Sequence, residues 1–302
     1  MRDRPRLALL AATALLAACA TLGPPGRLVL PLGGDEEAAA RVVSERARGA
    51  EVVYLGEVHD NPRHHAAQAR ILEAILATGA QPALAFEMLA EDQQAALDEL
   101  LASTDAPADG ERRLRWQARG WPDFAMYWPL LDLARRHRLP AVAADLDPAV
   151  VRRISRDGLA ALGDGQARLA SLLPPDPARE RAIARTIQKV HCDLLPERRL
   201  PLMVDSWHAR NVTIARRLEG ALRRAPQVVV IIGRGHQEAG GLPAQVAALR
   251  PGTRQLVVEM LEVLAGESPE RVLREGTGDI LWLAPAVDRP DPCAGLRQRL
   301  PG

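Results

Sequence analysis

The sequence has almost no excess of charge of either sign and few aromatic residues. Its 39 basic and 38 acidic residues nearly cancel, and Phe, Trp and Tyr make up only 3% of the chain. A nucleic-acid-binding protein needs a broad positive surface, which this balance does not supply. Lysine occurs once, at Lys189, among many arginines; this is typical of a GC-rich genome and indicates no function. We therefore expect no nucleic acid partner.

Several catalytic signatures are also missing. The chain contains no Gly-x-Ser-x-Gly elbow and no His-Glu-x-x-His motif, so it specifies no serine nucleophile and no zinc-protease helix. Gly233-Arg234-Gly235 resembles the start of a dinucleotide-binding loop, but the sixth position is Glu238 where that loop needs a small residue. These glycines instead favour a sharp turn that brings His236 forward.

Long apolar runs are absent outside the first 18 residues, where residues 7–18 follow three arginines. A run of about a dozen residues suits an export signal, whereas a membrane span takes roughly twenty. Leu16-Ala17-Ala18-Cys19 resembles a bacterial lipobox, so we predict cleavage before Cys19 and its lipidation. An ordinary signal peptide followed by a chance cysteine is the alternative.

A lipidated Cys19 would hold the protein on a membrane through several acyl chains. Ala20 follows it, and the absence of Asp at this position is typical of sorting to the outer membrane in diderm bacteria. The remaining length suits one large domain. We predict a signal peptide over 1–18, a lipidated N-terminus and tether over 19–34, and a single α/β domain over 35–302.

Only two cysteines remain after Cys19, namely Cys192 and Cys293. In an oxidising compartment they can form one intramolecular disulfide, which would tie the tail to the middle of the chain. The alternatives are two free thiols, or a thiolate metal ligand at Cys192 beside His191.

The body of the chain alternates short apolar runs with helical patterns, which predicts an α/β fold with a largely parallel central sheet flanked by helices. Helices are expected over 62–78, with Asn61 as N-cap, over 91–102, and from about residue 202. Aromatic residues gather in 116–137. Strands are expected at 51–55, 82–86, 141–144, 228–232 and 255–259, with a possible edge strand at 280–283.

The segment 157–199 interrupts this alternation and contains the loop signals Pro174-Pro175 and Pro177. We interpret it as a helical insertion. Insertions of this kind often form a lid or one wall of a ligand site.

Polar side chains follow four of the expected strands at the point where each strand ends. Because ligands bind at the carboxyl edge of a parallel sheet, these residues should share one rim: Glu57, His59, Glu87, Asp145 and His236. Imidazoles and carboxylates suit zinc, manganese or iron, and they also suit general base catalysis. For any single position, a helix cap or a solvated charge is an equally good interpretation. The repetition at every strand end favours a functional site.

Other histidines could join this rim. His64 and His65 lie in the first turn after the first strand, about 100° apart on the helix, so at most one should face the same ligand. Asp205, His208 and Asn211 recur every third residue on one face of a later helix. An exposed polar stripe is as good an interpretation of that spacing as a site wall.

Several ordered motifs resemble the ChaN family of haem-binding, iron-regulated lipoproteins, which is grouped with the Tiki and erythromycin-esterase-like proteins. The similarity covers residues 51–258. The motifs are 55–62 (LGEVHDNP), 64–68 (HHAAQ), 86–88 (FEM), 233–236 (GRGH) and 241–243 (GLP). His191-Cys192 and Asp291-Pro292-Cys293 are also similar to segments of that family.

The resemblance implies a membrane-anchored lipoprotein that binds haem and assists its uptake. A homodimer enclosing haem and an outer-membrane haem receptor are the partners it implies. Haem iron is commonly held by His, Met, Cys or Tyr, and tyrosine is the ligand associated with the family. The cofactor-binding candidates are His64, His65, Tyr127, Arg234 and His208.

The resemblance also supports a second hypothesis. The Gly-Glu-x-His and Gly-x-Gly-His elements look like the active site of Tiki-type metal-dependent peptidases. The chain would then be a hydrolase that uses Glu57, His59, Glu87 and His236 as catalytic residues and as ligands for Mn, Co or Zn.

Overall fold

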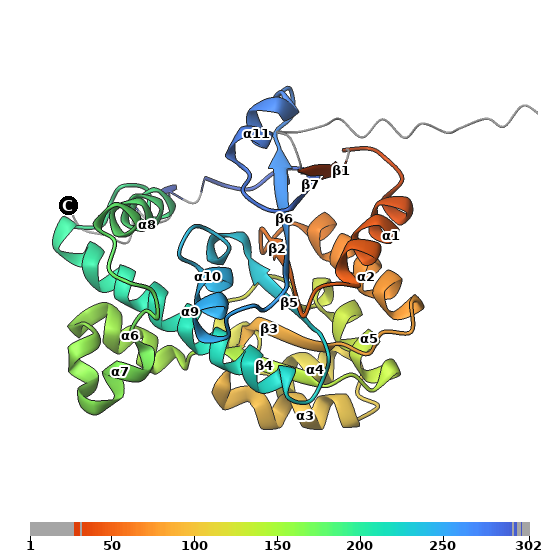
Figure 1. The fold of residues 1–302 in the computed structure, drawn as a ribbon, viewed down its shortest axis with the longest axis horizontal. Helices are drawn as coiled ribbons and strands as arrows, with labels where there is room; N and C mark the ends of the chain where they lie inside the picture. Colours follow the sequence, from red (N-terminus) through yellow and green to blue (C-terminus); the bar gives the residue numbers. More distant parts are fainter. Residues whose placement is uncertain (1–26, 31, 292, 295–296, 298–302) are drawn as a thin grey trace, which may run out of the picture.

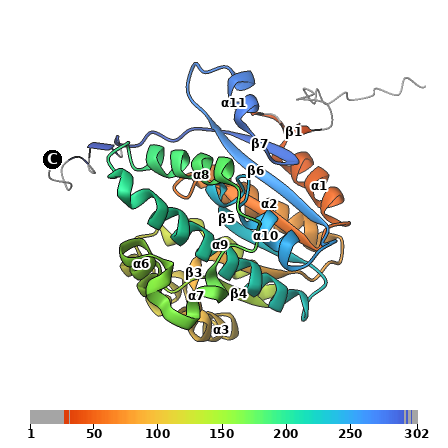
Figure 2. The same cartoon turned by 60° about the vertical axis from the view of Figure 1, so that its left-hand side comes forward.

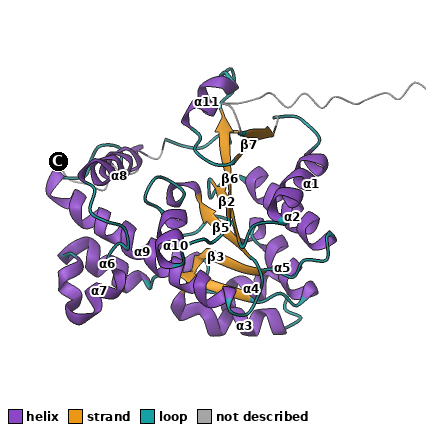
Figure 3. Cartoon of the chain, viewed as in Figure 1, coloured by secondary structure: helices purple, strands orange, loops and turns teal. Residues whose placement is uncertain are grey.

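The computed structural model describes residues 27–30, 32–291, 293, 294 and 297. The predicted signal peptide and Cys19 therefore lie outside the described residues. Seven strands form one wholly parallel sheet in the order β1-β7-β6-β2-β5-β3-β4, and helices flank it on both faces (Figures 1 and 3). The predicted fold class is confirmed. No helix in the described part of the chain is long and apolar enough to cross a membrane.

The strands extend slightly beyond the predicted ranges. They are β1 (Leu28–Leu30), β2 (Val52–Glu57), β3 (Ala83–Ala90), β4 (Ala141–Asp145), β5 (Val228–Gly233), β6 (Gln255–Val263) and β7 (Ile280–Pro285). The expectation that the last strand forms an edge is wrong, because β1 pairs outside it. The three residues of β1 belong to the segment that we interpreted as a tether. An apolar run of three residues is too short to predict a strand.

The longer helices cover the sheet, and shorter turns connect them. They are α1 (Glu36–Ala47), α2 (Pro62–Ala77), α3 (Gln94–Ala102), α4 (Pro107–Arg113), α5 (Trp128–His137), α6 (Pro148–Asp157), α7 (Gln166–Leu169), α8 (Pro177–Val190), α9 (Leu200–Leu222), α10 (Leu242–Leu249) and α11 (Pro269–Glu275). Short 3-10 segments lie at Glu91–Gln93, Gln117–Arg119, Phe124–Met126, Glu197–Arg199 and Arg234–His236, and a longer one, kinked at Gly163, lies at Leu159–Gly165.

The local signals at the start of α2 act as predicted. The Asn61 side chain accepts a hydrogen bond from the backbone N–H of Arg63 at 3.0 Å, and Pro62 occupies the first turn. The side-chain amide nitrogen of Asn61 also donates to Glu262 and to the carbonyl of Pro285. The cap therefore fixes the helix and joins it to the ends of β6 and β7.

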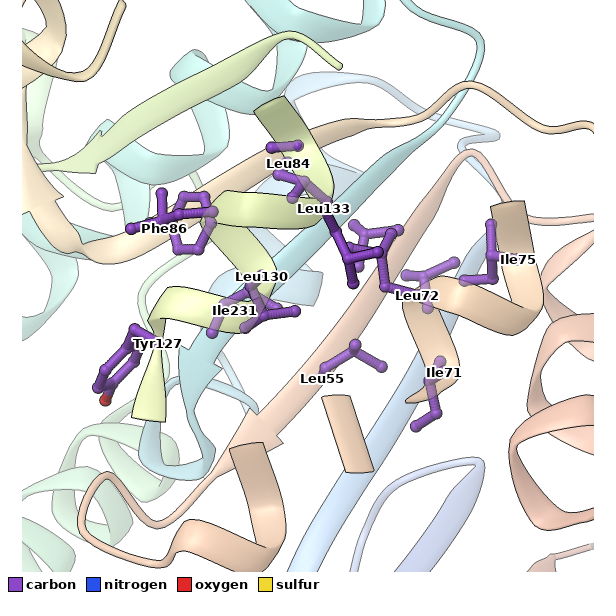
Figure 4. Packing of buried hydrophobic residues seen from close by; sticks show 14 of the residues in the cluster. Leu55, Ile71, Leu72, Ile75, Leu84, Phe86, Tyr127, Leu130, Leu133 and Ile231 are labelled. Carbon is purple, nitrogen blue, oxygen red and sulfur yellow. The ribbon is translucent and has the colours of Figure 1, made fainter. Parts of the chain in front are cut away.

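The core has two layers, one on each face of the sheet. Alternate residues of the central strands, such as Leu55 and Ile231, pack against α2 and α5, as Figure 4 shows. The intervening residues, such as Val230, face α9 and α10 instead. A strand buried on both faces must be apolar at successive positions, which explains the continuous runs in the sequence.

The predicted helical insertion is confirmed as a group of helices between β4 and α9. Figure 2 shows α6 and α7 on one side of α9 and α8 on the other. The tail after β7 runs across to the end of α8 (Figures 1 and 2), where Cys293 forms a disulfide with Cys192. The predicted pairing is confirmed, with a Cα–Cα separation of 5.5 Å.

Arg289 holds the middle of this tail. Its guanidinium donates to Asp60 at 2.7 and 2.9 Å and to Glu262 at 2.7 and 2.8 Å. Asp60 immediately follows His59, so the tail is attached beside the carboxyl edge of the sheet. Burial would raise the pKa of Glu262, but hydrogen bonds from Arg289 and Asn61 lower it below its ordinary value.

Reduction of the disulfide should destabilise the folded protein by about 2–5 kcal/mol, because the bond closes a long loop in the unfolded chain. Urea unfolding with and without dithiothreitol measures this difference. The double variant Cys192→Ser/Cys293→Ser is the control and should unfold at the lower midpoint under both conditions. An unchanged midpoint for the reduced wild-type protein would contradict the expectation.

Candidate functional site

Four neighbouring strands bring acidic and imidazole side chains to the carboxyl edge of the sheet. The strands β2, β5, β3 and β4 are adjacent in that order. The four side chains are Glu57, the last residue of β2; His236, in the turn after β5; Glu87, in β3; and Asp145, the last residue of β4. All four are buried. We call this group, together with His59, the rim cluster.

Glu87 does not terminate its strand as the sequence suggested. The pairing of β3 with β5 stops at Phe86, and its register with β4 shifts between Phe86 and Ala90. At this irregularity the Glu87 side chain points toward the other residues of the rim cluster, while the strand continues to Ala90. A local irregularity in strand pairing can re-aim one side chain, as a β-bulge does, and a run of apolar residues in the sequence gives no sign of it.

The carboxylate of Glu57 accepts hydrogen bonds on both oxygens. Oε1 lies 2.8 Å from the Tyr127 hydroxyl and 2.8 Å from Nδ1 of His59. Oε2 accepts from the Gln68 amide at 2.6 Å and lies 3.3 Å from Nδ1 of His65. The buried carboxylate is hydrogen-bonded on both oxygens and fixes the orientation of each of these donors.

Arg210 of α9 neutralises the other two carboxylates. Its guanidinium lies 2.8 Å from Glu87 and contacts both oxygens of Asp145 at 2.7–3.0 Å. Glu87 also accepts from the backbone N–H of Gly233 at 2.6 Å. Burial would raise the pKa of Glu87, but the positive charges of His236, His59 and Arg210 hold that pKa well below its ordinary value.

His236 is held between an amide and a carboxylate. The Asn211 amide nitrogen donates to the carbonyl of Trp207 at 2.8 Å, so its oxygen faces Nδ1 of His236 at 2.9 Å. That nitrogen must then carry a proton. Nε2 lies 3.2 Å from Oε1 of Glu87. The ring stacks parallel to Trp207, with the ring centroids 6.3 Å apart.

His59 is the member of the rim cluster that reaches solvent, with 31% of its side chain exposed. Its Nδ1 pairs with Glu57, while Nε2 lies 3.9 Å from Glu87, beyond hydrogen-bonding distance. Burial lowers the pKa of His59, but the hydrogen bond to Glu57 and the charge of Glu87 outweigh it and raise that pKa.

The space beside Nε2 of His59 depends on a glycine. A Cβ at Gly233 would lie 2.6 Å from Nε2, closer than any real contact. The ring of Trp121 flanks His59 on another side, with centroids 4.9 Å apart. The ring of His59 is thus held by its neighbours, with Nε2 making no hydrogen bond to the described residues.

Of the other predicted ligands, His64 and His65 are both buried. Nδ1 of His64 accepts from the backbone N–H of Val58 at 3.0 Å, so Nε2 carries the proton and has no free lone pair. Burial lowers the pKa of His64 to about 4. Nε2 of His65 lies 2.9 Å from the carbonyl of His59. Both rings hold the loop that carries His59.

The two tyrosines of the chain are fully buried. Tyr127 lies at the border of the apolar cluster with its hydroxyl directed away from the aliphatic side chains (Figure 4), toward Glu57. Burial, followed by the negative charge of Glu57, raises the pKa of Tyr127. Tyr54 donates to Gln255, and burial raises its pKa well above the ordinary value. Neither phenol is placed to become an exposed phenolate.

The last two cofactor candidates, Arg234 and His208, lie outside the rim cluster. Arg234 is partly exposed just after β5 and lies 3.2 Å from Glu259. His208 is buried on α9, where Nε2 lies 2.9 Å from Glu180 of α8. His208 and Asn211 lie on one face of α9 but have different partners. Asn211 contacts His236 of the rim cluster, and His208 links α9 to α8 through Glu180.

The predicted Mn, Co or Zn site finds no support in the structure. Within residues 27–297 as far as they are described, no group of three or more His, Cys, Asp or Glu side chains is arranged to hold a metal ion. Arg210 already supplies a positive charge between Glu87 and Asp145. A divalent cation at those carboxylates would be repelled by it.

Sequence reasoning missed Arg210 and Gln68 and the role of Tyr127 as a donor to Glu57. Arg210 lies between His208 and Asn211 in the sequence. The three-residue spacing drew attention to the helix face that carries those two residues, and Arg210 is not part of that spacing. The available signal was an excess of acidic residues over bases at the strand ends, because buried carboxylates need a partner. Nothing in the sequence indicates which of many arginines supplies it.

The comparisons with known proteins agree with the resemblance seen in the motifs. The family model described as "Haem-binding uptake, Tiki superfamily, ChaN" matches residues 43–246. A solved structure described as cofacial haem binding to ChaN of Campylobacter jejuni is 19% identical, with a TM-score of 0.57 over 72% of this chain and 84% of that one. No curated protein sequence matches the chain.

Two further solved structures are more distant. A variant of an erythromycin esterase in its open conformation is 14% identical, with a TM-score of 0.44 over 73% of this chain and 72% of that one. A protein from Bacillus cereus is 11% identical, with a TM-score of 0.46 over 78% and 74% of the two chains.

The substitution Arg210→Met should lower the free energy of unfolding by about 3–5 kcal/mol, because it leaves two buried carboxylates without their counter-charge. Arg210→Lys, which keeps the charge, should cost less. Arg216→Met on the exposed side of the same helix is the matched control and should change stability little. Urea unfolding of the four proteins tests this, and equal midpoints for the 210 and 216 methionine variants would contradict it.

Proposed function

Because the chain belongs to the ChaN family of the Tiki superfamily, described as haem-binding uptake proteins, we propose that it binds haem at the outer face of the rim cluster, with His59 as the iron ligand. Haem-binding proteins commonly use an imidazole nitrogen whose partner nitrogen is hydrogen-bonded. His59 meets that description, since Nδ1 pairs with Glu57, Nε2 makes no hydrogen bond within the described residues, and the side chain is 31% exposed.

The single observation that carries this assignment is the exposure of His59. The other donor side chains at the rim are buried and engaged: Tyr127 donates to Glu57, and His64 and His65 hydrogen-bond to the backbone. The tyrosine ligand expected from the family does not fit the two tyrosines of this chain, because neither reaches the surface. The proposal therefore moves the ligand to an imidazole.

Nearby side chains complement the rest of the group. Trp121 packs beside His59 and Trp207 stacks on His236, and both indoles are partly exposed, so each offers an aromatic face to a flat macrocycle. Arg234 is 40% exposed and suits a propionate carboxylate. Bound haem supplies an iron centre, while these residues orient it and hold its charged edge.

Haem bound through His59 would keep one face exposed, so a second copy of the chain covering that face belongs to the proposal. Enclosure between two subunits removes a large apolar surface from water. The protein would then carry haem at the cell envelope and pass it to an outer-membrane receptor. Anchoring through Cys19 is a separate part of this proposal, supported by the lipobox alone.

A second candidate function is hydrolysis without a resident metal. The pair formed by Glu57 and Nδ1 of His59 is the arrangement of a general base, because the carboxylate orients the ring and stabilises its charged form. Although burial lowers the pKa of His59, the hydrogen bond to Glu57 and the charge of Glu87 raise it overall, which favours the charged ring that forms when the imidazole takes a proton from water. Water beside Nε2 would be the nucleophile.

Titration of the mature protein with hemin should give a saturable Soret change, and His59→Ala should shift the band and weaken binding about tenfold or more. His137→Ala, an exposed histidine at the end of α5, is the matched control and should behave as wild type. Identical titrations for His59→Ala and wild type would refute the ligand assignment. Absence of any saturable change, with ester hydrolysis lost in His59→Ala, would favour the second candidate. Sedimentation velocity on the same samples should show a doubled mass if haem is enclosed by two copies.

Growth of expressing cells with a labelled fatty acid should label the wild-type protein, and Cys19→Ala should abolish that label and release the protein from membranes. Cys293→Ala is the control, because it removes a cysteine without touching the lipobox. Equal labelling of the Cys19→Ala variant would exclude anchoring at that residue.

A further inference from the structure

A cavity lies at the edge of the sheet opposite the rim cluster. It has a volume of about 430 Å³ and is formed by the end of α1, the start of β6 and the turn that precedes β7. Among the described residues that line it are Arg27, Arg46, Arg254 and Asp279. Because parallel strands all begin at this edge, the cavity shares no residue with the proposed haem site.

The lining of this cavity carries excess positive charge: three arginines and one acidic side chain, that of Asp279. The Asp279 carboxylate accepts a hydrogen bond from the backbone N–H of Val257 at 2.8 Å. A single carboxylate carries one negative charge and does not balance three guanidinium groups. The charge imbalance is local, since the whole chain is nearly neutral.

Two of the three arginines are positioned by backbone contacts. Arg27 donates to the carbonyl of Gly276 at 2.5 Å, and Arg254 donates to the carbonyl of Gly49 at 2.6 Å. Arg254 also lies 3.5 Å from Glu51, whose carboxylate is shared with Arg250. Arg46, on the last turn of α1, makes no ion pair with any residue that the structure describes.

The turn before β7 is held from inside the protein. Oε2 of Glu259 accepts from the backbone N–H groups of Thr277 and Gly278 at 2.7 and 3.0 Å. These two donors are thus already used, and the turn keeps a fixed shape. Recognition in the cavity rests on the guanidinium groups that surround it.

We propose that this cavity binds a phosphate group. Guanidinium groups have planar sets of donors that match phosphate oxygens and stay charged at every relevant pH. Glu51 offsets the charge of Arg254 only in part, because it is shared with Arg250, and an anion between the three guanidinium groups would relieve their remaining repulsion. The volume accommodates a phosphate together with a small organic substituent.

The position of the cavity connects it with the proposed anchor. Arg27 directly precedes β1, and only residues 20–27 separate β1 from Cys19. An extended chain of that length spans at most roughly 27 Å. The phosphate of a lipid headgroup is therefore within reach if Cys19 is acylated, and a soluble phosphorylated compound is the other source of the same chemistry.

Binding of inorganic phosphate to the full mature protein, measured by isothermal titration calorimetry, should be saturable. Arg46→Glu should weaken it by about tenfold or more, because it reverses a charge that lines the cavity. Arg41→Glu changes the net charge by the same amount on the same helix but lies outside the cavity, so it should alter the affinity less than twofold. Both positions are exposed, so both variants should fold, which circular dichroism verifies.

Flotation of vesicles distinguishes the two sources. All proteins in this assay carry Cys19→Ala, so that no lipid anchor contributes. If the ligand is a headgroup, vesicles containing phosphatidylglycerol should retain the protein with no further change and the protein with Arg41→Glu, but not the protein with Arg46→Glu. If phosphate binds and no vesicle does, the ligand is soluble, and the phosphate site still stands. Equal losses in Arg41→Glu and Arg46→Glu would show a net-charge effect and overturn the proposal. So would the absence of saturable binding to both probes. These results do not depend on hemin binding.

Discussion

Three buried carboxylates at one edge of the sheet set the requirements that the surrounding structure meets. Glu57, Glu87 and Asp145 are each carried to the same place by the direction of parallel strands. Buried negative charges are costly unless they are paired and hydrogen-bonded. The donors therefore come from every neighbouring layer: Arg210 from α9, Gln68 from α2 and Tyr127 from the segment before α5. The packing of helices on both faces is constrained by the need to deliver these groups.

The same requirement explains how the edge is divided between structure and function. Most of the polar side chains hold one another and are closed to solvent. His59 is different, because one of its nitrogens is used by Glu57 and the other is left free beside Gly233. In the proposed function, a ligand or a substrate would meet this one ring, whose orientation the buried network fixes. Pre-organisation of this kind lowers the cost of binding.

The sequence predicts the sheet, its parallel direction and the convergence of the strand-end residues, because apolar runs and local caps are read directly from neighbouring letters. It does not predict which partner each residue takes. Asn211 and His208 are three residues apart on one helix, yet one contacts His236 and the other contacts Glu180. The choice depends on where the helical insertion packs, which is set by distant contacts. The bulge at Glu87 and the short strand β1 escape detection for the same reason. The pairing of Cys192 with Cys293 was one of three open interpretations, and the resemblance supplied the family that the comparisons then confirmed.

The disulfide also imposes an order of events on folding. Cys293 lies 101 residues after Cys192, and the intervening chain contains α9 and the strands β5, β6 and β7. During synthesis the bond cannot form until all of that chain has emerged, so α8 must first be held by non-covalent packing, chiefly against α9. Oxidation is then the last step, and it captures an arrangement that weaker contacts have already selected. A chain with a misplaced α9 would leave both thiols unpaired and accessible to protein quality-control factors.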